Sequence, residues 1–216
     1  MLTENIKINV KMDVPYKSSK VKSNYMLLKR YFDLFLIFIS FPVLLFIFVF
    51  FAFILFFHFN GKIFFTQKRI GFKGKPFIIY KFKTMTDSAV DGKENIHHCS
   101  NRETKFGTFL RIHRIDEIPQ IINVIRGDMS LVGPRPEAYY HYEYFSEIIE
   151  NYKHRKCVPP GLTGLAQISY PYTDTIEGTI GKLTYDFEYI SNFSFKSDLI
   201  IIIRTFIQIF TGKSPK

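Results

Sequence analysis

The chain has 216 residues, enough for one domain with a core of its own and too few for two comfortable ones. Its formal charge of +10 favours an anionic partner, and nucleic acid, anionic lipid and phosphorylated small molecules all fit that sign. The two cysteines, Cys99 and Cys157, form no metal-type pair, and a reducing compartment explains them better than a disulfide does.

Residues 1–28 are predicted to form a polar, lysine-rich tail that is mobile or lies on a surface. The next five residues, from Lys29 and Arg30 to Asp33, are typical of an interfacial collar. In such a collar, long basic side chains extend to phosphate headgroups.

From residue 34 to residue 57 the chain carries no charge, and this run of about 24 residues is long enough to cross a bilayer as a helix. Pro42 removes a backbone hydrogen bond within the run, and the hydroxyl of Ser40 could satisfy a freed backbone group. Basic residues flank both ends equally, although positive charge normally marks the cytoplasmic end. A helix that bends at Pro42 and returns to the same face satisfies both observations, and a kinked span fits about as well.

The rest of the chain mixes short strands with helices and turn-rich loops. Strand-like runs at 63–66 and 77–80 flank a Gly-rich basic turn, which predicts a β-hairpin. Helical patterns are expected at 106–125, where Pro119 interrupts, and at 137–156, with loops at 86–104, 127–136 and 159–164. The apolar stretch 198–210 is too short to span a membrane and favours an interfacial or core helix. The pattern predicts an α+β fold that is mostly helical.

Two neighbouring carboxylates, Asp116 and Glu117, come shortly before Pro119. Neighbouring side chains on a helix project roughly 100° apart, so one carboxylate could attack a phosphorus atom while the other holds a divalent metal. Pro119 is best tolerated in a first helical turn, where the helix dipole and the flanking arginines favour ionised carboxylates. Taken alone, the pair is better explained as a solvated acidic start of a helix.

Several cations are candidates for binding phosphate. Arg135 lies between Pro134 and Pro136, which restrict the backbone and hold the guanidinium in a direction suited to bidentate recognition. Lys81 and Lys83 alternate with apolar residues, as on a strand with one basic face, and could meet an anionic substrate or lipid headgroups; a merely solvated face fits equally well. Arg69 adds another cation nearby, and Asp186 is a further polar candidate on an expected helix.

Together these motifs resemble those of the monotopic phosphoglycosyl transferases, also called the bacterial sugar transferase family, in its small form without the extra N-terminal membrane domain of larger relatives. The resemblance runs from about Lys29 to Phe210. Its motifs are, in chain order, Lys29-Arg30-x-x-Asp33, the proline-broken apolar run, Phe65-Thr66-Gln67-x-Arg69-x-Gly71, Tyr80-Lys81-Phe82-Lys83-Thr84-Met85, Asp116-Glu117-x-Pro119-Gln120, Asn123-Val124, Gly127-Asp128-Met129-Ser130-x-Val132-Gly133-Pro134-Arg135-Pro136 and Pro160-Gly161-x-Thr163-Gly164-x-Ala166-Gln167.

The resemblance implies a monotopic protein on the cytoplasmic face of the bacterial inner (plasma) membrane. Residues 29–59 are then a re-entrant membrane helix, and residues 60–216 a cytoplasmic catalytic domain with interfacial amphipathic helices. The activity implied is transfer of a sugar 1-phosphate from a UDP-sugar to polyprenyl (undecaprenyl) phosphate, which initiates capsule, O-antigen, exopolysaccharide or glycoprotein assembly.

The resemblance also implies roles for individual residues. Asp116 attacks the sugar-bearing phosphate and expels UMP, and polyprenyl phosphate then attacks the covalent aspartyl-phosphosugar intermediate. Glu117 binds Mg²⁺ as the second catalytic carboxylate. The substrate phosphates are bound by Arg111 and Arg135, with Lys81 and Lys83 as further candidates.

The chain departs from the family's usual pattern at three positions. Phe41 separates Ser40 from Pro42, Pro159 stands where an arginine is common, and Leu165 stands where an aromatic residue is common. The last two affect expected substrate contacts and leave the Asp-Glu pair unchanged.

Two alternatives compete with an active enzyme. A membrane adaptor that binds nucleic acid or lipid would explain the charge and the anchor, but not the Asp-Glu pair or the Gly-Pro-Arg-Pro loop; no nucleic-acid partner is therefore expected. An inactive family member is disfavoured because Asp116, Glu117 and Arg135 are all present.

Overall fold

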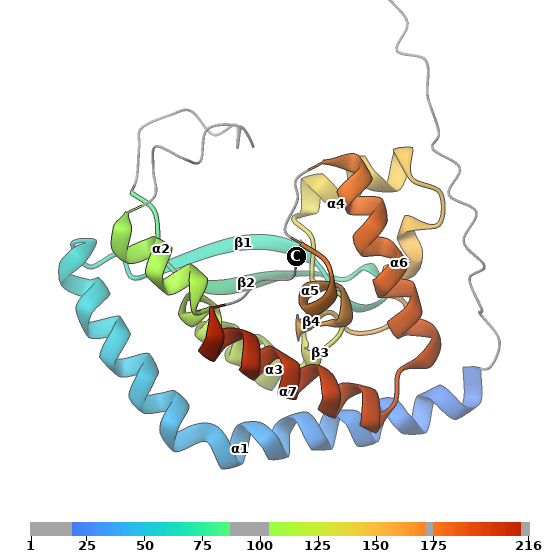
Figure 1. The fold of residues 1–216 in the computed structure, drawn as a ribbon, viewed down its shortest axis with the longest axis horizontal. Coiled ribbons are helices and arrows are strands. Elements are labelled where there is room, and N and C mark those ends of the chain that lie inside the picture. The colour runs from blue at the N-terminus through green and yellow to red at the C-terminus, as the bar shows by residue number, and fades with distance from the viewer. Residues whose placement is uncertain (1–18, 87–103, 172–174, 213–216) are drawn as a thin grey trace, which may run out of the picture.

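The computed structural model describes residues 19–86, 104–171 and 175–212. Most of these residues are helical, and two pairs of short strands complete the fold (Figure 1). In chain order the elements are α1 (Ser19–His58), β1 (Phe64–Ile70), η1 (Phe72–Gly74), β2 (Pro76–Phe82), α2 (Lys105–Ile112), η3 (Ile115–Gln120), α3 (Ile121–Arg126), β3 (Ser130–Val132), α4 (Tyr139–Ile148), η4 (Tyr152–Cys157), β4 (Gly161–Thr163), α5 (Leu165–Ser169), α6 (Ile176–Asn192) and α7 (Phe195–Thr211).

The apolar run forms one long helix, α1, with Pro42 inside it. Figure 1 shows α1 changing direction near its middle, with the remaining elements on the inner side of the bend. Pro42 has no N–H, so the carbonyl of Phe38 lacks its helical donor. The Ser40 hydroxyl does not serve that carbonyl; it donates to the carbonyl oxygens of Leu36 at 2.7 Å and Ile37 at 3.3 Å. The proline therefore permits the bend, while the serine bonds to the backbone one turn earlier.

The helix also begins earlier than the expected start at residue 29. Residues 19–28 of the predicted tail are helical, and residues 1–18 of that prediction lie outside the described part. From Tyr25 to His58, α1 is long and apolar enough to cross a membrane on length and composition alone. Many of its side chains are highly exposed, including Phe38 at 79% and Phe46 at 71%.

The expected interfacial collar is wrong for two of its residues, because they are buried inside the protein. The Lys29 ammonium pairs with Asp198 of α7 at 2.5 Å, and Asp33 accepts a hydrogen bond from Ser130 of β3 at 2.6 Å. Arg30 donates to the carbonyl oxygens of Val124 and Ile125, at the end of α3. These contacts bind the first arm of α1 to the rest of the fold, so all three charged side chains bond to groups inside the protein.

The predicted hairpin is confirmed. β1 and β2 pair antiparallel, with Phe64 opposite Phe82 and Ile70 opposite Pro76. A tight turn containing η1 joins them, in which Lys73 adopts a left-handed φ of 55°. The hairpin carries Lys81 towards η3, with which β2 makes extensive contact.

The two predicted loops at 127–136 and 159–164 instead contain strands that pair with each other. β3 and β4 are parallel, with Ser130 opposite Gly161 and Val132 opposite Thr163. Gly161 permits this pairing, since a Cβ at that position would lie 2.1 Å from the backbone nitrogen of Gly133. Strands of three residues separated by α4 and η4 leave little periodic signal in the sequence.

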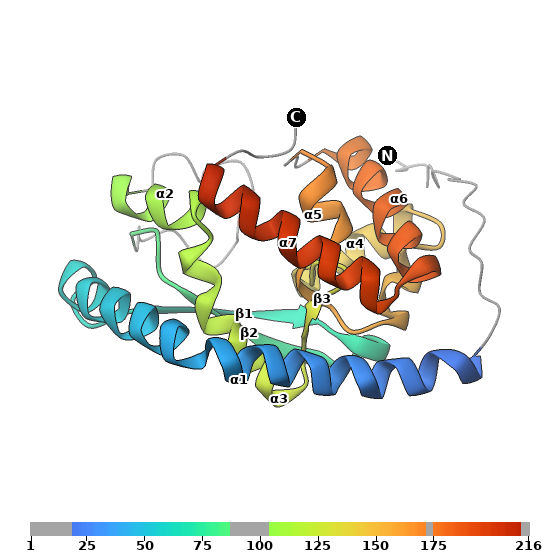
Figure 2. The ribbon, with the colours of Figure 1, turned by 60° about the horizontal axis from the view of Figure 1, so that its bottom comes forward.

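The remaining helices follow the predictions with shifted boundaries. The pattern expected at 106–125 is divided into α2, η3 and α3, and the one at 137–156 into α4 and η4. The apolar stretch 198–210 lies within α7 (Figure 2), which begins with a Ser194–Ser197 capping box.

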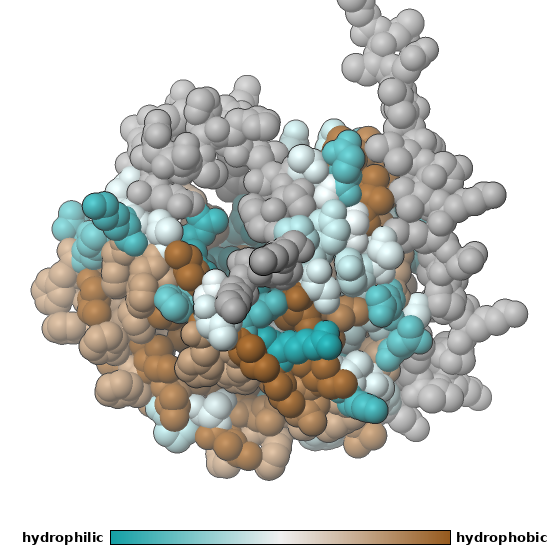
Figure 3. All heavy atoms as spheres, viewed as in Figure 1, coloured by the Kyte–Doolittle hydropathy of each residue, from teal (hydrophilic) through white to brown (hydrophobic). Residues whose placement is uncertain are grey.

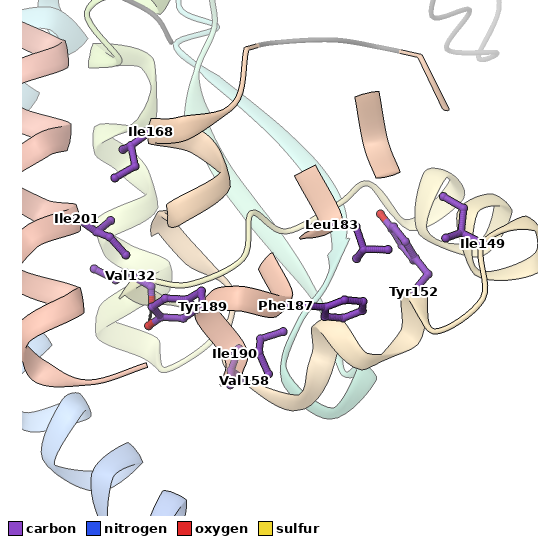
Figure 4. Close-up of a cluster of buried hydrophobic side chains, with 10 residues drawn as sticks. All are labelled: Val132, Ile149, Tyr152, Val158, Ile168, Leu183, Phe187, Tyr189, Ile190 and Ile201. Carbon is purple, nitrogen blue, oxygen red and sulfur yellow. Dashed lines mark hydrogen bonds between the residues drawn. The ribbon is translucent and has the colours of Figure 1, made fainter. Parts of the chain in front are cut away.

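The main core lies between β3, η4, α5, α6 and α7. Figure 4 shows its buried side chains, with Leu183 and Phe187 of α6 directed towards Tyr152 of η4. On the face drawn in Figure 3, hydrophobic side chains gather over α1 and α7. Exposed residues of α7 include Ile203, Phe206 and Phe210. The C-terminal helix therefore exposes apolar side chains, and its place at a membrane interface stays a prediction.

Candidate active site

Asp116 and Glu117 lie in the first turn of η3, as Pro119 predicted. Arg114, just before η3, has a left-handed φ of 53° and turns the chain sharply after α2. Both acidic residues are 7% exposed. They are thus a buried pair of carboxylates, and the interpretation as a solvated acidic helix start is excluded.

Glu117 is held by two cations that come from different parts of the chain. The Lys81 ammonium of β2 donates to Glu117 Oε1 at 3.1 Å, and the Arg135 guanidinium donates to the same oxygen at 2.6 Å. Burial alone would raise the pKa of Glu117, but Arg135 and Lys81 outweigh burial and hold the pKa well below its usual range. Glu117 is therefore a fixed anion at the centre of the site.

Asp116 is in a different state. Its carboxylate has no hydrogen bond or ion pair with another residue in the described ranges. Burial and the charge of Glu117 raise its pKa to about 6, against the opposing effect of Lys81, Arg135 and Arg111. The expected effect of the flanking arginines is present, because Arg111 lowers this pKa, but burial and the charge of Glu117 outweigh it.

The predicted phosphate-binding cations divide into two groups. Lys81 and Arg135 meet at Glu117, and Arg111 lies close enough to act on the charge of Asp116. The ammonium of Lys83 lies over the ring of Phe59, 5.4 Å from its centroid. The Arg135 side chain is 39% exposed, so its guanidinium reaches solvent beside the buried pair.

The donor set suits a hard divalent cation. Mg²⁺ prefers oxygen ligands and is commonly held by one or two carboxylates together with substrate phosphates. Lys81 and Arg135 both bond to Glu117 Oε1, and the neighbouring Asp116 carboxylate has no hydrogen-bond partner within the described residues. The carboxylates of Asp116 and Glu117 therefore suit Mg²⁺, the metal that the family resemblance implied.

Asn123 of α3 supports the site and was not among the predicted site residues. Its buried amide donates to the carbonyl of Ile78 at 2.7 Å, and its oxygen accepts from the N–H of Tyr80 at 3.2 Å. The residue thereby fixes β2, and with it Lys81, relative to η3 and α3. Its place in the Asn123-Val124 motif of the resemblance was the available signal.

Two of the unusual residues lie away from the carboxylates. Leu165 packs against the main core. Pro159 lines a small cavity with Met26 and Tyr189, and the lining does not include Asp116 or Glu117. Neither change alters the environment of the acidic pair.

Comparison with known proteins gives one family match, a model described as bacterial sugar transferase that covers residues 24–212. The chain is 40% identical over 153 residues to a UDP-N-acetylgalactosamine-undecaprenyl-phosphate N-acetylgalactosaminephosphotransferase of Aeromonas hydrophila, covering 70% of this chain and 36% of that protein. It is 43% identical over 159 residues to a UDP-glucose:undecaprenyl-phosphate glucose-1-phosphate transferase of Klebsiella pneumoniae, covering 72% of this chain and 34% of that protein.

A third relative is nearer in length. The uncharacterized sugar transferase EpsL of Bacillus subtilis is 42% identical over 146 residues, which are 68% of this chain and 69% of that protein. The matched part is about a third of the length of the Aeromonas and Klebsiella proteins.

Proposed function

The chain belongs to the bacterial sugar transferase family, and from this premise we propose that it transfers a sugar 1-phosphate from a UDP-sugar to polyprenyl (undecaprenyl) phosphate, releasing UMP. The observation that carries the proposal is the unequal state of two adjacent buried carboxylates. Glu117 is bound by Lys81 and Arg135, whereas Asp116 has no hydrogen-bond partner among the described residues and is available to attack.

In the first half of the reaction, an Asp116 carboxylate oxygen attacks the phosphorus that bears the sugar. A bond forms between that oxygen and the phosphorus, the bond from phosphorus to the bridging oxygen breaks, and UMP leaves with the electron pair. In the second half, a phosphate oxygen of the lipid attacks the same phosphorus. Asp116 is regenerated as a carboxylate and the product is polyprenyl diphosphate-sugar.

The cations of the site stabilise the negative charge that gathers on the phosphoryl oxygens during both halves. Arg135 uses one nitrogen on Glu117 and keeps further N–H donors on its exposed side. Arg111 acts from the side of Asp116. Because the pair is buried, these charges act more strongly than they would in water.

Mg²⁺ would be held by Glu117, with Asp116 beside it, and when bound would neutralise charge on the diphosphate of the donor. The buried anion of Glu117 is kept ionised by Lys81 and Arg135, so it can bind a cation without first losing a proton.

We also propose that α1 is a re-entrant helix and that the body lies on the cytoplasmic face of the inner membrane. The bend of α1 leaves both arms on the side of the body (Figure 1), and basic residues flank both ends. The exposed apolar side chains of α1 and α7 supply an extended surface for lipid (Figure 3). A lipid-phosphate acceptor would then meet the site at the interface, where glycan assembly begins.

The test is nucleotide release by the detergent-solubilised protein with Mg²⁺, polyprenyl phosphate and a panel of UDP-sugars. The proposal predicts UMP from the wild type, none from Asp116→Asn, and a normal rate from Glu188→Gln, which changes an exposed carboxylate of α6. Release of UDP would mean ordinary glycosyl transfer. No nucleotide from folded protein across the panel, with salt-sensitive binding of nucleic acid, would favour the adaptor instead.

A further inference from the structure

The backbone that presents Arg135 is held by two other arginines. Arg155 of η4 donates from Nη2 to the carbonyl oxygen of Arg135 at 3.0 Å. Arg69 of β1 donates from Nη1 to the next carbonyl oxygen, that of Pro136, at 2.9 Å. Two consecutive carbonyls are therefore bound by guanidinium groups from separate elements.

Arg155 is anchored before it reaches this loop. Its Nε donates to Asp186 of α6 at 2.7 Å, and its Nη1 donates to the Tyr152 hydroxyl at 2.8 Å and to Glu137 at 3.4 Å. Its side chain is 9% exposed and Tyr152 belongs to the main core (Figure 4). All three guanidinium nitrogens are engaged with the protein, so Arg155 is unsuited to binding substrate.

Arg69 reaches the loop from the hairpin. Its Nη2 donates to Gln67, and the next residue, Ile70, donates its N–H to the carbonyl of Glu137 at 3.3 Å. The hairpin that positions Arg69 also carries Lys81, the other cation bound to Glu117. The β1–β2 hairpin thus carries Lys81 directly and supports Arg135 by binding its backbone through Arg69.

These contacts limit the freedom that the two prolines leave. Pro134 and Pro136 fix their own φ angles, but the direction of the Arg135 side chain also depends on rotation of the neighbouring peptide planes. Bonding the carbonyls of residues 135 and 136 fixes those planes. The Arg135 guanidinium is then held 2.6 Å from Glu117 before any substrate arrives.

We propose that Arg155 and Arg69 are positioning residues whose contribution to phosphosugar transfer is exerted through Arg135. The inference rests on the proposed function, in which Arg135 stabilises the phosphoryl charge. Misplacing a catalytic group by about 1 Å can cost about 100-fold in rate, so positioning of this kind has a measurable effect.

The test is a double-mutant cycle on kcat/KM for UMP release. Arg155→Lys keeps the charge opposite Asp186 but loses the planar fork that reaches Arg135. We expect it to lower kcat/KM about 100-fold in the wild-type background. In an Arg135→Ala background, measured at high enzyme concentration, Arg155→Lys should have no further effect, because Arg155 acts through Arg135. A change in kcat/KM of no more than about twofold counts as no effect, since double-mutant cycles scatter by about that much.

Tyr152→Phe is the matched control, because it removes one partner of Arg155 and leaves the contact with the Arg135 carbonyl; its kcat/KM should stay within about threefold of the wild type. If Arg155→Lys no longer melts cooperatively, Arg69→Met carries the same cycle, with the adjacent exposed Lys68→Met as its control.

An equal loss in both backgrounds, or no loss in the wild-type background, overturns the inference while the proposed function stands. If the wild type itself releases no UMP, the proposed function fails first and the inference falls with it.

Discussion

The buried ion pair between Lys29 and Asp198 yields a prediction whose magnitude follows from its geometry. The two groups lie 2.5 Å apart, and their side chains are only 6% and 2% exposed. Removing one partner of a buried pair costs about 3–5 kcal/mol, because the other charge is left in a poorly solvated site. Lys29→Met leaves Asp198 with the hydroxyl donors of Tyr25 and Tyr189, at 2.9 and 2.8 Å, which places the cost near the lower end, at about 3 kcal/mol.

The assay is thermal unfolding of the purified protein in one fixed detergent. For a chain of this size, about 3 kcal/mol corresponds to a drop in melting temperature of roughly 6–12 °C. The double variant Lys29→Met with Asp198→Asn removes both charges and should regain part of that loss. A shift of less than about 2 °C in Lys29→Met, equivalent to less than about 1 kcal/mol, would refute the claim that this pair joins α1 to α7.

Three further predictions concern the site and its supports. The rate of UMP release should fall as the pH drops below about 6, because burial and Glu117 raise the pKa of Asp116 to about 6 and a protonated carboxyl is a poor nucleophile. In Lys81→Met the midpoint of this pH profile should move to higher pH, since the variant lacks a cation that lowers the pKa of Asp116. An unchanged midpoint would contradict this reasoning. Gly161→Ala should destabilise the fold by about 1–3 kcal/mol, because its Cβ would lie 2.1 Å from the backbone nitrogen of Gly133, and a wild-type melting curve would show that the β3–β4 contact is looser than described. Chelation of divalent cations should stop UMP release and added Mg²⁺ should restore it; full activity in excess chelator would remove the metal from the proposal.

Local patterns predict the parts of this fold that depend on neighbouring residues. The hairpin follows from alternating runs around a glycine-rich turn, and the first-turn position of Asp116 and Glu117 follows from Pro119. The bend in α1 follows from Pro42. In each case the interaction that determines the structure joins residues close together in the chain, so the feature can be predicted from the sequence alone.

Contacts between distant segments were not predictable in this way. Lys29 and Asp198 are 169 residues apart, and Lys29 next to an apolar run has the pattern of a headgroup-binding lysine. Arg155 stands within a basic run that is typical of a solvated surface, and only the fold brings it to Asp186 and the Arg135 carbonyl. Identifying these partners requires knowing which elements pack together.

The net electrostatic state of Asp116 was not predictable for a related reason. The sequence displays the nearby arginines but not the burial of the carboxyl group, and burial is the larger effect on its pKa. At Glu117 the cations outweigh burial and lower the pKa, because Lys81 and Arg135 bond to this carboxylate and not to that of Asp116.

The central claim is that Asp116 becomes bonded to the phosphosugar. The most direct measurement is the mass of the intact protein and of its proteolytic peptides after incubation with Mg²⁺ and the UDP-sugar that supports the fastest UMP release, in the absence of polyprenyl phosphate. We predict a mass increase of one sugar phosphate on the peptide that contains Asp116, discharged when polyprenyl phosphate is added and absent from Asp116→Asn. Rapid turnover to UMP with no such adduct, or an adduct that persists in Asp116→Asn, would contradict the account.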